Sequence, residues 1–526
     1  MKLKTALWGG DKPGRAVTLG IQHVFAMFGS TVLVPALTGL DPAVTLFCMG
    51  IGTLIFHLIT KGVVPAFMGS SFSFIASICA VAANCGGKDF APYVGWGIMA
   101  SGVLYIILAL LVKLLGTKRI TSFFPPIVTG CMIIIIGMML APTAMSNITT
   151  VRGDVPASAT VVVKEGSVET DDFVLCDYHY DADHPDYFVS GWIESKYLEL
   201  KPDHIVDNAF AKDNRIESYT NSGTDYLVAN TDGVSMRSEA SEESATVAGT
   251  ATWKNWVVAI VTIAVIIIVM FFFRGFWKLI PILFGIVAGY LTALALGMVD
   301  TAPLAEASWF ALPKFTPFLQ GKDWSKIIFA ITMIAPISVV TFVEHVGDIT
   351  ANGAVTGHNY IEDPGLHRTL LGCGLASIFS GGMGGPAATT YSENTGVLAA
   401  TRNYNPATLR IAAVFAIVLS LFGKVSGLLN SIPTAVMGGV SVVLFGMIAS
   451  VGLRMLVENG VDFTKSYNLI IAAVMLVIGL GLSSGITVGN VTVSGTAIAA
   501  VLGVILAKIL PKEESEERHK EKVAKD

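Results

Sequence analysis

The sequence contains few charged residues. Asp, Glu, Lys and Arg make up 14% of its 526 residues, whereas a soluble domain has about 25%. Hydrophobic residues make up 53%, in many separate runs, and the mean hydropathy is +0.66. This composition excludes an ordinary soluble domain. It predicts an all-α polytopic membrane protein, because a helix satisfies its own backbone hydrogen bonds in lipid.

Cysteines and metal-binding patterns are also scarce. The six cysteines are scattered, and no group of His, Cys, Asp or Glu has the spacing of a metal site, so neither a metal nor another cofactor is expected. Nothing in the spacing of Cys85 and Cys176, which fall in segments predicted outside, demands a disulfide. Residues 381–385 are glycine-rich, but no lysine follows them, which excludes a phosphate loop. No nucleophile–base pair is visible, so the sequence argues against an enzyme.

Fourteen apolar runs are candidate membrane spans. They lie at about 16–39, 43–60, 64–83, 93–115, 123–142, 254–273, 277–298, 326–346, 367–382, 386–400, 407–428, 432–452, 466–484 and 492–510. Lys and Arg collect in every second connection, which by the positive-inside rule places the N- and C-termini in the cytoplasm. The predicted divisions are spans 1–5 in 1–145, an insert at 146–252, spans 6–7 and an outer loop in 253–325, spans 8–11 in 326–428, spans 12–14 in 429–511 and a cytoplasmic tail at 512–526.

The polar segment 146–252 differs from the rest of the chain. Residues 152–250 hold 20 acidic and 7 basic side chains, and the number of preceding spans places this insert outside the cell. Alternating stretches such as 160–164 favour a small β-rich domain over a partly disordered loop. The spacing of its histidines matches no metal motif, which favours a solvated acidic face.

The two halves of the chain contain similar segments. Gln22-His23 lies at the start of the first span and Glu344-His345 at the end of the eighth, while the third and tenth spans are both interrupted by Gly, Ser, Thr and Pro. Spans seven apart cross the membrane in opposite directions, as in a 7+7 inverted repeat. Paired interrupted segments of this kind point to a substrate site near the bilayer midplane.

Acidic residues in apolar segments are the leading candidates for that site, because a carboxylate at membrane depth costs about 3 kcal/mol on insertion scales. Glu344 and Asp348 lie four residues apart on one helix face, where repulsion between like charges favours uptake of a proton. Asp348 could instead be a solvated residue at the helix end, and His345 a core histidine. Glu393 follows a segment typical of a half-helix start, whose free N–H groups bind polar ligand atoms. Its alternative role is to cap or bond a neighbouring helix.

Several motifs resemble those of the nucleobase–ascorbate transporter family. Residues 393–402 read Glu-Asn-Thr-Gly, four further residues, and Thr-Arg, which is similar to the family signature. Gln22-His23, Glu344-His345 and the segments 65–72 and 433–440 are further hallmarks. The resemblance covers both membrane halves. Within the family the chain looks most like the bacterial uracil permeases, which have Glu where purine-type relatives often have Gln at the first signature position.

This resemblance implies a fold of two intertwined seven-span repeats with short strands in segments 3 and 10. Spans 1–4 and 8–11 would form a core domain, and spans 5–7 and 12–14 a gate domain. The residues implied to bind uracil are Glu344 and Glu393 through its ring N–H groups, Phe72 and Ser392 through backbone contacts, Tyr391 lining the site and Ser30 close by.

The resemblance also implies how uptake would be driven. Glu344 is the leading candidate for coupling uracil to a proton, with Asp348 and His345 beside it. Two residues depart from the uracil permease pattern, because Asp348 stands where that pattern has His and Phe445 where it has Tyr. A histidine can bond a ring carbonyl or relay a proton, whereas an ionised Asp can do only part of this. The set of residues that would couple uracil to the proton therefore stays open.

The function that follows is proton-coupled uptake of uracil by alternating access across the cell membrane. The expected partners are the nucleobase, membrane lipid and a second copy bound through the gate domain, with no nucleic acid. Three alternatives stay open. One is a xanthine or other purine carrier of the same family, the second is an anion transporter of similar 7+7 architecture, and the third is a receptor that uses the acidic insert.

Overall fold

A computed structural model of the chain describes residues 13–85, 90–152, 154–155, 160–163, 173–179, 188–194, 198–200, 225–228, 234–236, 248–482, 485–488 and 491–511. The chain divides into two compact units. The membrane unit comprises Met1–Ala144 and Val261–Asp526, and the insert unit comprises Met145–Ile260. The predicted tail at 512–526 and the insert residues His184 and His204 lie outside the described residues.

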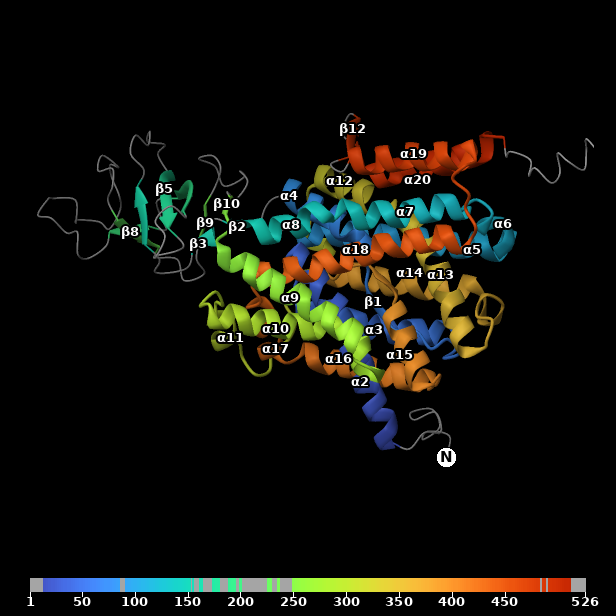
Figure 1. Cartoon of the computed structure of the whole chain (residues 1–526), viewed down its shortest axis with the longest axis horizontal. Helices are drawn as coiled ribbons and strands as arrows, with labels where there is room; N and C mark the ends of the chain where they lie inside the picture. Colours follow the sequence, from blue (N-terminus) through green and yellow to red (C-terminus); the bar gives the residue numbers. More distant parts are fainter. Residues whose placement is uncertain are drawn as a thin grey trace, which may run out of the picture. The chain divides into compact units, whose positions relative to one another are not determined.

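The membrane unit is mostly helical (Figure 1). Its helices before the insert are α2 (Pro13–Thr38), α3 (Pro42–Ile59), η1 (Phe72–Phe74), α4 (Ile75–Asn84), α5 (Ala91–Leu115), α6 (Thr117–Thr121), α7 (Pro126–Met139) and the start of α8 (Ala141–Thr149). Those after it are the end of α9 (Trp253–Phe272), η5 (Gly275–Leu279), α10 (Pro281–Ala295), α11 (Ala302–Glu306), η6 (Phe318–Gln320), α12 (Trp324–Ile334), α13 (Ile337–Thr356), η7 (Ile361–Gly365), α14 (Leu366–Met383), α15 (Ser392–Thr401), α16 (Pro406–Ser420), α17 (Gly423–Asn430), α18 (Thr434–Glu458), α19 (Ser466–Gly481) and α20 (Gly495–Ile509).

Many of these helices are suited to cross a bilayer. Among the described residues, seven helical stretches are long and apolar enough, and the pair α16–α17, bent by 80°, makes up to eight. Shorter apolar helices occupy Phe72–Asn84, Pro281–Ala295, Ser466–Gly481 and Gly495–Ile509. The protein is therefore a multi-pass membrane protein, and the count of fourteen spans stays a prediction.

Local sequence explains where several helices begin and end. The Asp41 carboxylate accepts hydrogen bonds from the backbone N–H groups of Ala43 (2.7 Å) and Val44 (3.0 Å) at the start of α3. The Asn405 side chain accepts one from Ala407 N at 3.0 Å at the start of α16. Both caps bind N–H groups that have no partner inside the helix. Gly384, in the left-handed region at φ +86°, ends α14, as glycine commonly does.

Close backbone contact joins α5 and α14. A Cβ on Gly102 would lie 2.6 Å from the Gly374 carbonyl oxygen, and one on Gly374 would lie 2.8 Å from that of Gly102. Gly95 and Gly381 repeat this contact at 2.5 and 2.7 Å. Gly95 precedes Gly102 by seven residues on α5, and Gly381 follows Gly374 by seven on α14, so each helix presents both glycines on one face. Small residues at such crossings let membrane helices pack backbone to backbone.

Two hydrophobic clusters lie in different parts of the membrane unit. The first, which we call cluster A, joins side chains of α2, α3, α5, α13, α14 and α16, including Met49, Phe56 and Leu370. Cluster B joins α7, α19 and α20, including Ile135 and Met475. Figure 1 shows α19 and α20 side by side, next to α7.

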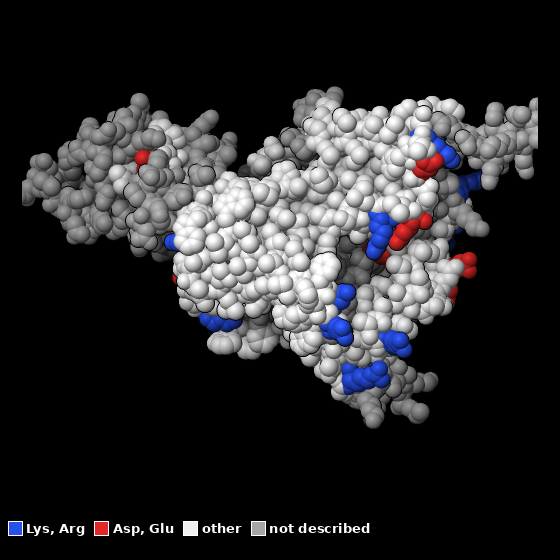
Figure 2. Space-filling view, in the orientation of Figure 1, with Lys and Arg blue, Asp and Glu red and all other residues white. Residues whose placement is uncertain are grey.

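The outer surface of the membrane unit is largely apolar. Figure 2 shows a broad face with few charged side chains over α9, α10 and α18, with most of the visible Lys, Arg, Asp and Glu gathered toward the end of the helices near α15. Exposed hydrophobic side chains on these helices include Val287, Leu291, Leu294, Val451 and Leu453. Such a surface is suited to lipid.

The insert unit contains paired strands. A five-stranded antiparallel sheet has the order β6-β5-β4-β8-β7. Its strands are β4 (Thr160–Val163), β5 (Phe173–His179), β6 (Phe188–Glu194), β7 (Leu198–Leu200) and β8 (Asp225–Val228). Further antiparallel pairs join β2 (Thr150–Arg152) to β10 (Ala248–Thr250) and β3 (Asp154–Val155) to β9 (Val234–Ser235). Cys176 on β5 is a buried free thiol, and burial raises its pKa to about 12.

Candidate functional site

A short antiparallel strand pair lies inside the membrane unit. β1 (Met68–Ser70) pairs with β11 (Ala388–Thr390), with Gly69 opposite Thr389. Flanking backbone bonds extend the pair, since Ser71 N donates to Ala387 O and Tyr391 N to Phe67 O, both at 3.1 Å. Both strands are buried. Non-helical backbone is tolerated at membrane depth only where protein surrounds it or it lines a cavity, which makes this pair the natural place for a site.

Two helices start where these strands end. Residues 72–84, which comprise η1 and α4, follow β1, and α15 follows β11, with Tyr391 as the residue before its first turn. The first N–H groups of a helix have no partner within the helix, and its dipole is positive there. The strand pair therefore brings two helix N-termini to the same region, where they can bind polar atoms of a ligand.

Tyr391 braces the strand pair. Its hydroxyl donates to the backbone carbonyl of Ser70 at 2.8 Å and lies 3.3 Å from Ser70 Oγ. The ring lies directly against Gly69, where any Cβ would collide with it. Tyr391 is only 5% exposed. The structure thus gives this residue a bracing position, while its predicted role in lining the site stays a prediction.

Glu344 lies on α13, close to the start of α4. Ser73 Oγ donates to its Oε2 at 3.2 Å, and the residue is half-buried. The sequence predicted that the third span is interrupted by small and hydroxyl-bearing residues, but it did not predict Ser73 as a partner of Glu344. A half-buried carboxylate beside a helix start is placed to accept N–H donors from a polar ligand.

His345 and Asp348 meet at the end of β11. Thr390 Oγ1 donates to Asp348 Oδ2 at 2.9 Å and lies 3.2 Å from His345 Nδ1. The other ring nitrogen, His345 Nε2, lies 2.9 Å from Thr369 Oγ1 on α14. His345 is fully buried, whereas Asp348 is half-buried. The sequence did not predict either threonine, because each lies far along the chain from its partner.

The remaining predicted residues are placed less completely. Phe72 is half-buried and packs against a cluster that includes Leu33, Leu444 and Phe445. The backbone of Ser30 belongs to α2 and that of Ser392 and Glu393 to α15. The side chains of these last three residues lie outside the described part of the chain.

Four buried polar atoms near the motifs have no hydrogen-bond partner among the residues that the structure describes. They are both amide atoms of Asn394, Gln22 Oε1 and His23 Nδ1. Asn394 and His23 are each 1% exposed. Buried polar atoms normally have partners, so these groups are available to water or to a solute.

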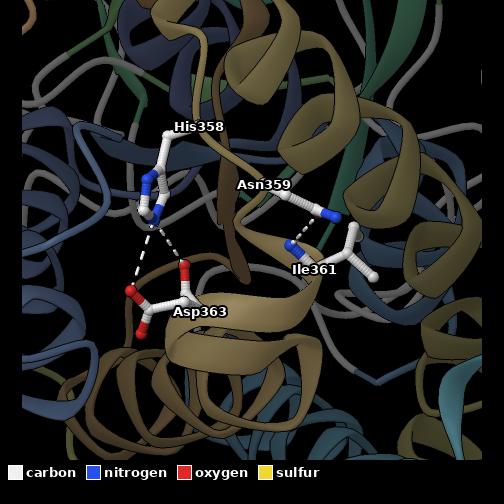
Figure 3. A network of polar contacts seen from close by, with 4 residues as sticks. All are labelled: His358, Asn359, Ile361 and Asp363. Atoms are coloured by element: carbon white, nitrogen blue, oxygen red, sulfur yellow. Dashed lines mark hydrogen bonds and ion pairs between the residues drawn. The ribbon is translucent and has the colours of Figure 1, made fainter.

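A polar cluster after α13 lies apart from the site (Figure 3). His358 Nε2 lies 3.4 Å from Asp363 Oδ2 and 3.1 Å from its carbonyl oxygen, and Ile361 N donates to Asn359 Oδ1 at 3.2 Å. The side chains of His358 and Asp363 are 43% and 73% exposed. These contacts shape the connection from α13 to α14. In the part of the chain that the structure describes, no three His, Cys, Asp or Glu residues are grouped as a metal site requires.

Comparison with known proteins decides the family. The sequence model described as "Permease family" matches residues 14–169 and 232–488. The chain belongs to this family. It is 38% identical over 505 residues to the uracil permease of Bacillus subtilis (strain 168), covering 95% of this chain and 94% of that protein. It is 32% identical over 497 residues to the uracil permease of Escherichia coli (strain K12), covering 94% and 91%.

Solved transporter structures share the fold of this permease. The transmembrane domain of the cyanobacterial bicarbonate transporter BicA superposes with a TM-score of 0.53 at 14% identity, covering 94% of this chain and 96% of that one. The anion transporter Slc26a9 from mouse, in its inward-facing state, gives 0.54 at 10% identity, covering 95% and 68%. Because the chain belongs to the permease family, it is a transporter and not an enzyme, and its predicted family relationship is confirmed.

Proposed function

We propose that this permease takes up uracil together with a proton. The observation that carries the proposal is its similarity to uracil permeases over nearly the whole chain. The site chemistry supports it, because Glu344 is half-buried beside the strand pair and two helix N-termini. Uracil has N–H donors flanking a carbonyl, and carboxylates accept N–H bonds strongly.

In the proposed complex, Glu344 and Glu393 accept the ring N–H groups. The backbone N–H groups at Phe72 and Ser392, at the starts of the two helices, donate to ring carbonyls. Tyr391 holds the strands in place beside the ring, and Ser30 lies nearby. No ion or further cofactor is required apart from the proton. That proton is carried by Glu344, with Asp348 and His345 forming the neighbouring polar network.

The proposed movement is alternating access between a core domain and a gate domain within a 7+7 inverted repeat. Clusters A and B support this division, because cluster A draws on spans assigned to the core and cluster B mainly on spans assigned to the gate. The pairing of β1 with β11 supports the repeat, since the strands come from segments 3 and 10. We also propose cytoplasmic termini, an external insert and a homodimer formed through the gate domain in the cell membrane.

Uptake of labelled uracil into proteoliposomes tests the substrate and the coupling. An inward proton gradient should increase uptake, and unlabelled uracil should compete while xanthine and hypoxanthine should not. Competition by xanthine with no uracil uptake would move the substrate to the purines. Uracil uptake that ignores the gradient would remove the proton from the proposal.

Glu344→Gln and Glu393→Gln test the binding residues. Each change removes a charged acceptor worth about 1.5–3 kcal/mol, so uracil binding should weaken roughly 10- to 100-fold. Glu362→Gln is the matched control, because Glu362 is exposed in η7 and should leave binding unchanged. Binding by isothermal titration at wild-type affinity in both site variants would contradict the assignment.

A further inference from the structure

Four hydrogen-bond links join Asp348 to the first turn of α14. They run from Asp348 Oδ2 to Thr390 Oγ1 (2.9 Å), from there to His345 Nδ1 (3.2 Å), from His345 Nε2 to Thr369 Oγ1 (2.9 Å), and from Thr369 Oγ1 to the Leu366 carbonyl oxygen (3.0 Å). The links draw on α13, β11 and α14. Every member except Asp348 is almost fully buried.

We infer that the protonation state of Asp348 sets which ring nitrogen of His345 carries the hydrogen, through Thr390 on one side and Thr369 on the other. The inference rests on the proposed proton coupling and adds positioning roles for His345, Thr390 and Thr369. His345 stays neutral in both states. It therefore responds to a proton on Asp348, next to the proposed carrier Glu344, without carrying a charge itself.

Counting hydrogens gives this result. Each threonine hydroxyl has one hydrogen and a neutral imidazole has one N–H. With Asp348 protonated, four hydrogens serve four links: Asp348 donates to Thr390, Thr390 to His345 Nδ1, His345 Nε2–H to Thr369, and Thr369 to Leu366. With Asp348 ionised, only three hydrogens remain for the same four links, so one link must break.

The link that costs least to break is the one to Leu366. Leu366 is the first residue of α14. In an α-helix its carbonyl oxygen already accepts a hydrogen bond from the N–H of the residue four positions later, so it keeps a partner when Thr369 turns away. In the ionised state Thr390 therefore donates to Asp348, His345 Nδ1–H donates to Thr390, and Thr369 turns to donate to His345 Nε2. The ring hydrogen has then moved from Nε2 to Nδ1.

With Asp348 ionised, a second N–H on a charged His345 imidazolium could also supply the fourth hydrogen and keep all four links. The burial of His345 excludes this arrangement. His345 and Thr369 have no exposed surface, and Cys373, whose Sγ lies 3.5 Å from Nδ1, has none either. Transferring a charge to such surroundings is very costly unless it is paired. Cys373 contributes a weak donor or acceptor in either tautomer.

Other ionisable groups lie on α13 and on the elements packed against it, where their charges act on the four hydrogen-bond links. Glu344 lies on α13 itself, one turn from Asp348. The elements packed on α13 carry the following ionisable residues: Tyr93, Tyr105 and Lys113 on α5, Cys131 on α7, Lys326 on α12, Glu362 and Asp363 on η7, His367, Arg368 and Cys373 on α14, Glu393 on α15, and Lys508 on α20. Of these, the Tyr105 hydroxyl donates to Thr341 Oγ1 at 2.6 Å and so has a partner outside the four hydrogen-bond links.

Nitrogen-15 NMR of histidine-labelled protein tests the inference directly, without uracil or transport. His345→Gln identifies the His345 signals, and spectra are compared from about pH 4, close to the usual pKa of a carboxyl group, to about pH 10. Asp348→Asn is the fixed reference, because its amide N–H donates to Thr390 as a protonated carboxyl does. We expect Nε2–H in Asp348→Asn at every pH and Nδ1–H in the wild type at the highest pH. The same tautomer in both proteins there, or an imidazolium at any pH above 4, overturns the inference.

Uptake by Thr369 variants provides the functional test. Thr369→Val leaves Nε2 without its donor in the ionised state, and losing one hydrogen bond predicts a fall in uracil uptake of about 2- to 10-fold at high pH. Thr369→Ser keeps the hydroxyl and should retain the wild-type pH profile. A wild-type pH profile in Thr369→Val overturns the positioning role of Thr369. If neither the wild type nor any variant transports uracil, the proposed function is wrong, but the NMR result still tests the inference.

Discussion

At the scale of single residues, the site depends on side chains that hold the non-helical backbone of β1 and β11 in place. Tyr391 bonds the carbonyl of Ser70, a residue 321 positions away in the chain, and its ring rests on Gly69. Such a contact fixes the register of β1 against β11, in which three residues of each strand are paired. The positions of both helix N-termini follow from that register.

Tyr391→Phe should therefore loosen the strand pair. The change removes one buried hydrogen bond and leaves the Ser70 carbonyl with one bond fewer, which predicts a loss of stability of about 0.5–1.5 kcal/mol. Thermal unfolding in detergent should show a lower melting temperature. Tyr404→Phe is the matched control, because Tyr404 is 39% exposed and should give no change. An unchanged melting temperature in both variants would show that the hydroxyl does not brace the strands.

The candidate site could be predicted only in part from the sequence. Glu344 and Glu393 stand out because carboxylates are rare in apolar runs. This feature can be recognised from a short stretch of sequence around each residue. Ser73, Thr369 and Thr390 carry no such signal. Thr369 and Thr390 bond His345 across 24 and 45 residues, and Ser73 bonds Glu344 across 271. Pairings of this length are created by tertiary packing and leave no periodic pattern in the chain.

At the scale of secondary structure elements, the contact between α5 and α14 depends on facing glycines. Gly102 faces Gly374, and Gly95 faces Gly381, with backbone oxygens where a Cβ would stand. The sequence showed that residues 381–385, at the end of α14, are rich in glycine. It could not show which glycines face another helix, because that depends on the crossing point.

Gly374→Ala and Gly382→Ala separate packing from helix propensity. Both residues lie in α14, but a Cβ on Gly374 would lie 2.8 Å from the Gly102 carbonyl oxygen, whereas nothing lies within 4 Å of one on Gly382. We expect Gly374→Ala to destabilise the protein by about 1–3 kcal/mol, the usual cost of overpacking. Gly382→Ala should be neutral or slightly stabilising. Equal melting temperatures for the two variants would contradict the close contact.

At the scale of the whole molecule, the chain combines an apolar membrane unit with an acidic insert unit. The composition shift made this division visible in the sequence, and alternating residues indicated strands in the insert. The order of the five-stranded sheet was not predictable, because β8 pairs with both β4 and β7 from separate parts of the insert. Nothing in the described strands resembles the site in the membrane unit.

Removing the insert tests whether it contributes to transport. We expect a protein in which Thr150 and Thr250 are joined by a short Gly-containing turn to retain uracil uptake per molecule. The physical reason is that the proposed binding residues all lie in the membrane unit. Uptake in proteoliposomes, normalised to monodisperse protein, is the measurement. Loss of uptake with an intact membrane unit would instead assign the insert a part in function, as the receptor alternative requires.

The pairing of β2 with β10 has a consequence for how this chain can change. Thr150 lies opposite Thr250, and Ala251 N donates to Thr149 O at 3.0 Å, so the insert leaves and returns at neighbouring backbone positions. The internal stretch that the family model does not match, 170–231, lies wholly between these two strands in the sequence. A lobe with adjacent ends can be gained, lost or exchanged as a cassette with little demand on the host. The same junction therefore offers a place to graft a fluorescent reporter or an antibody epitope.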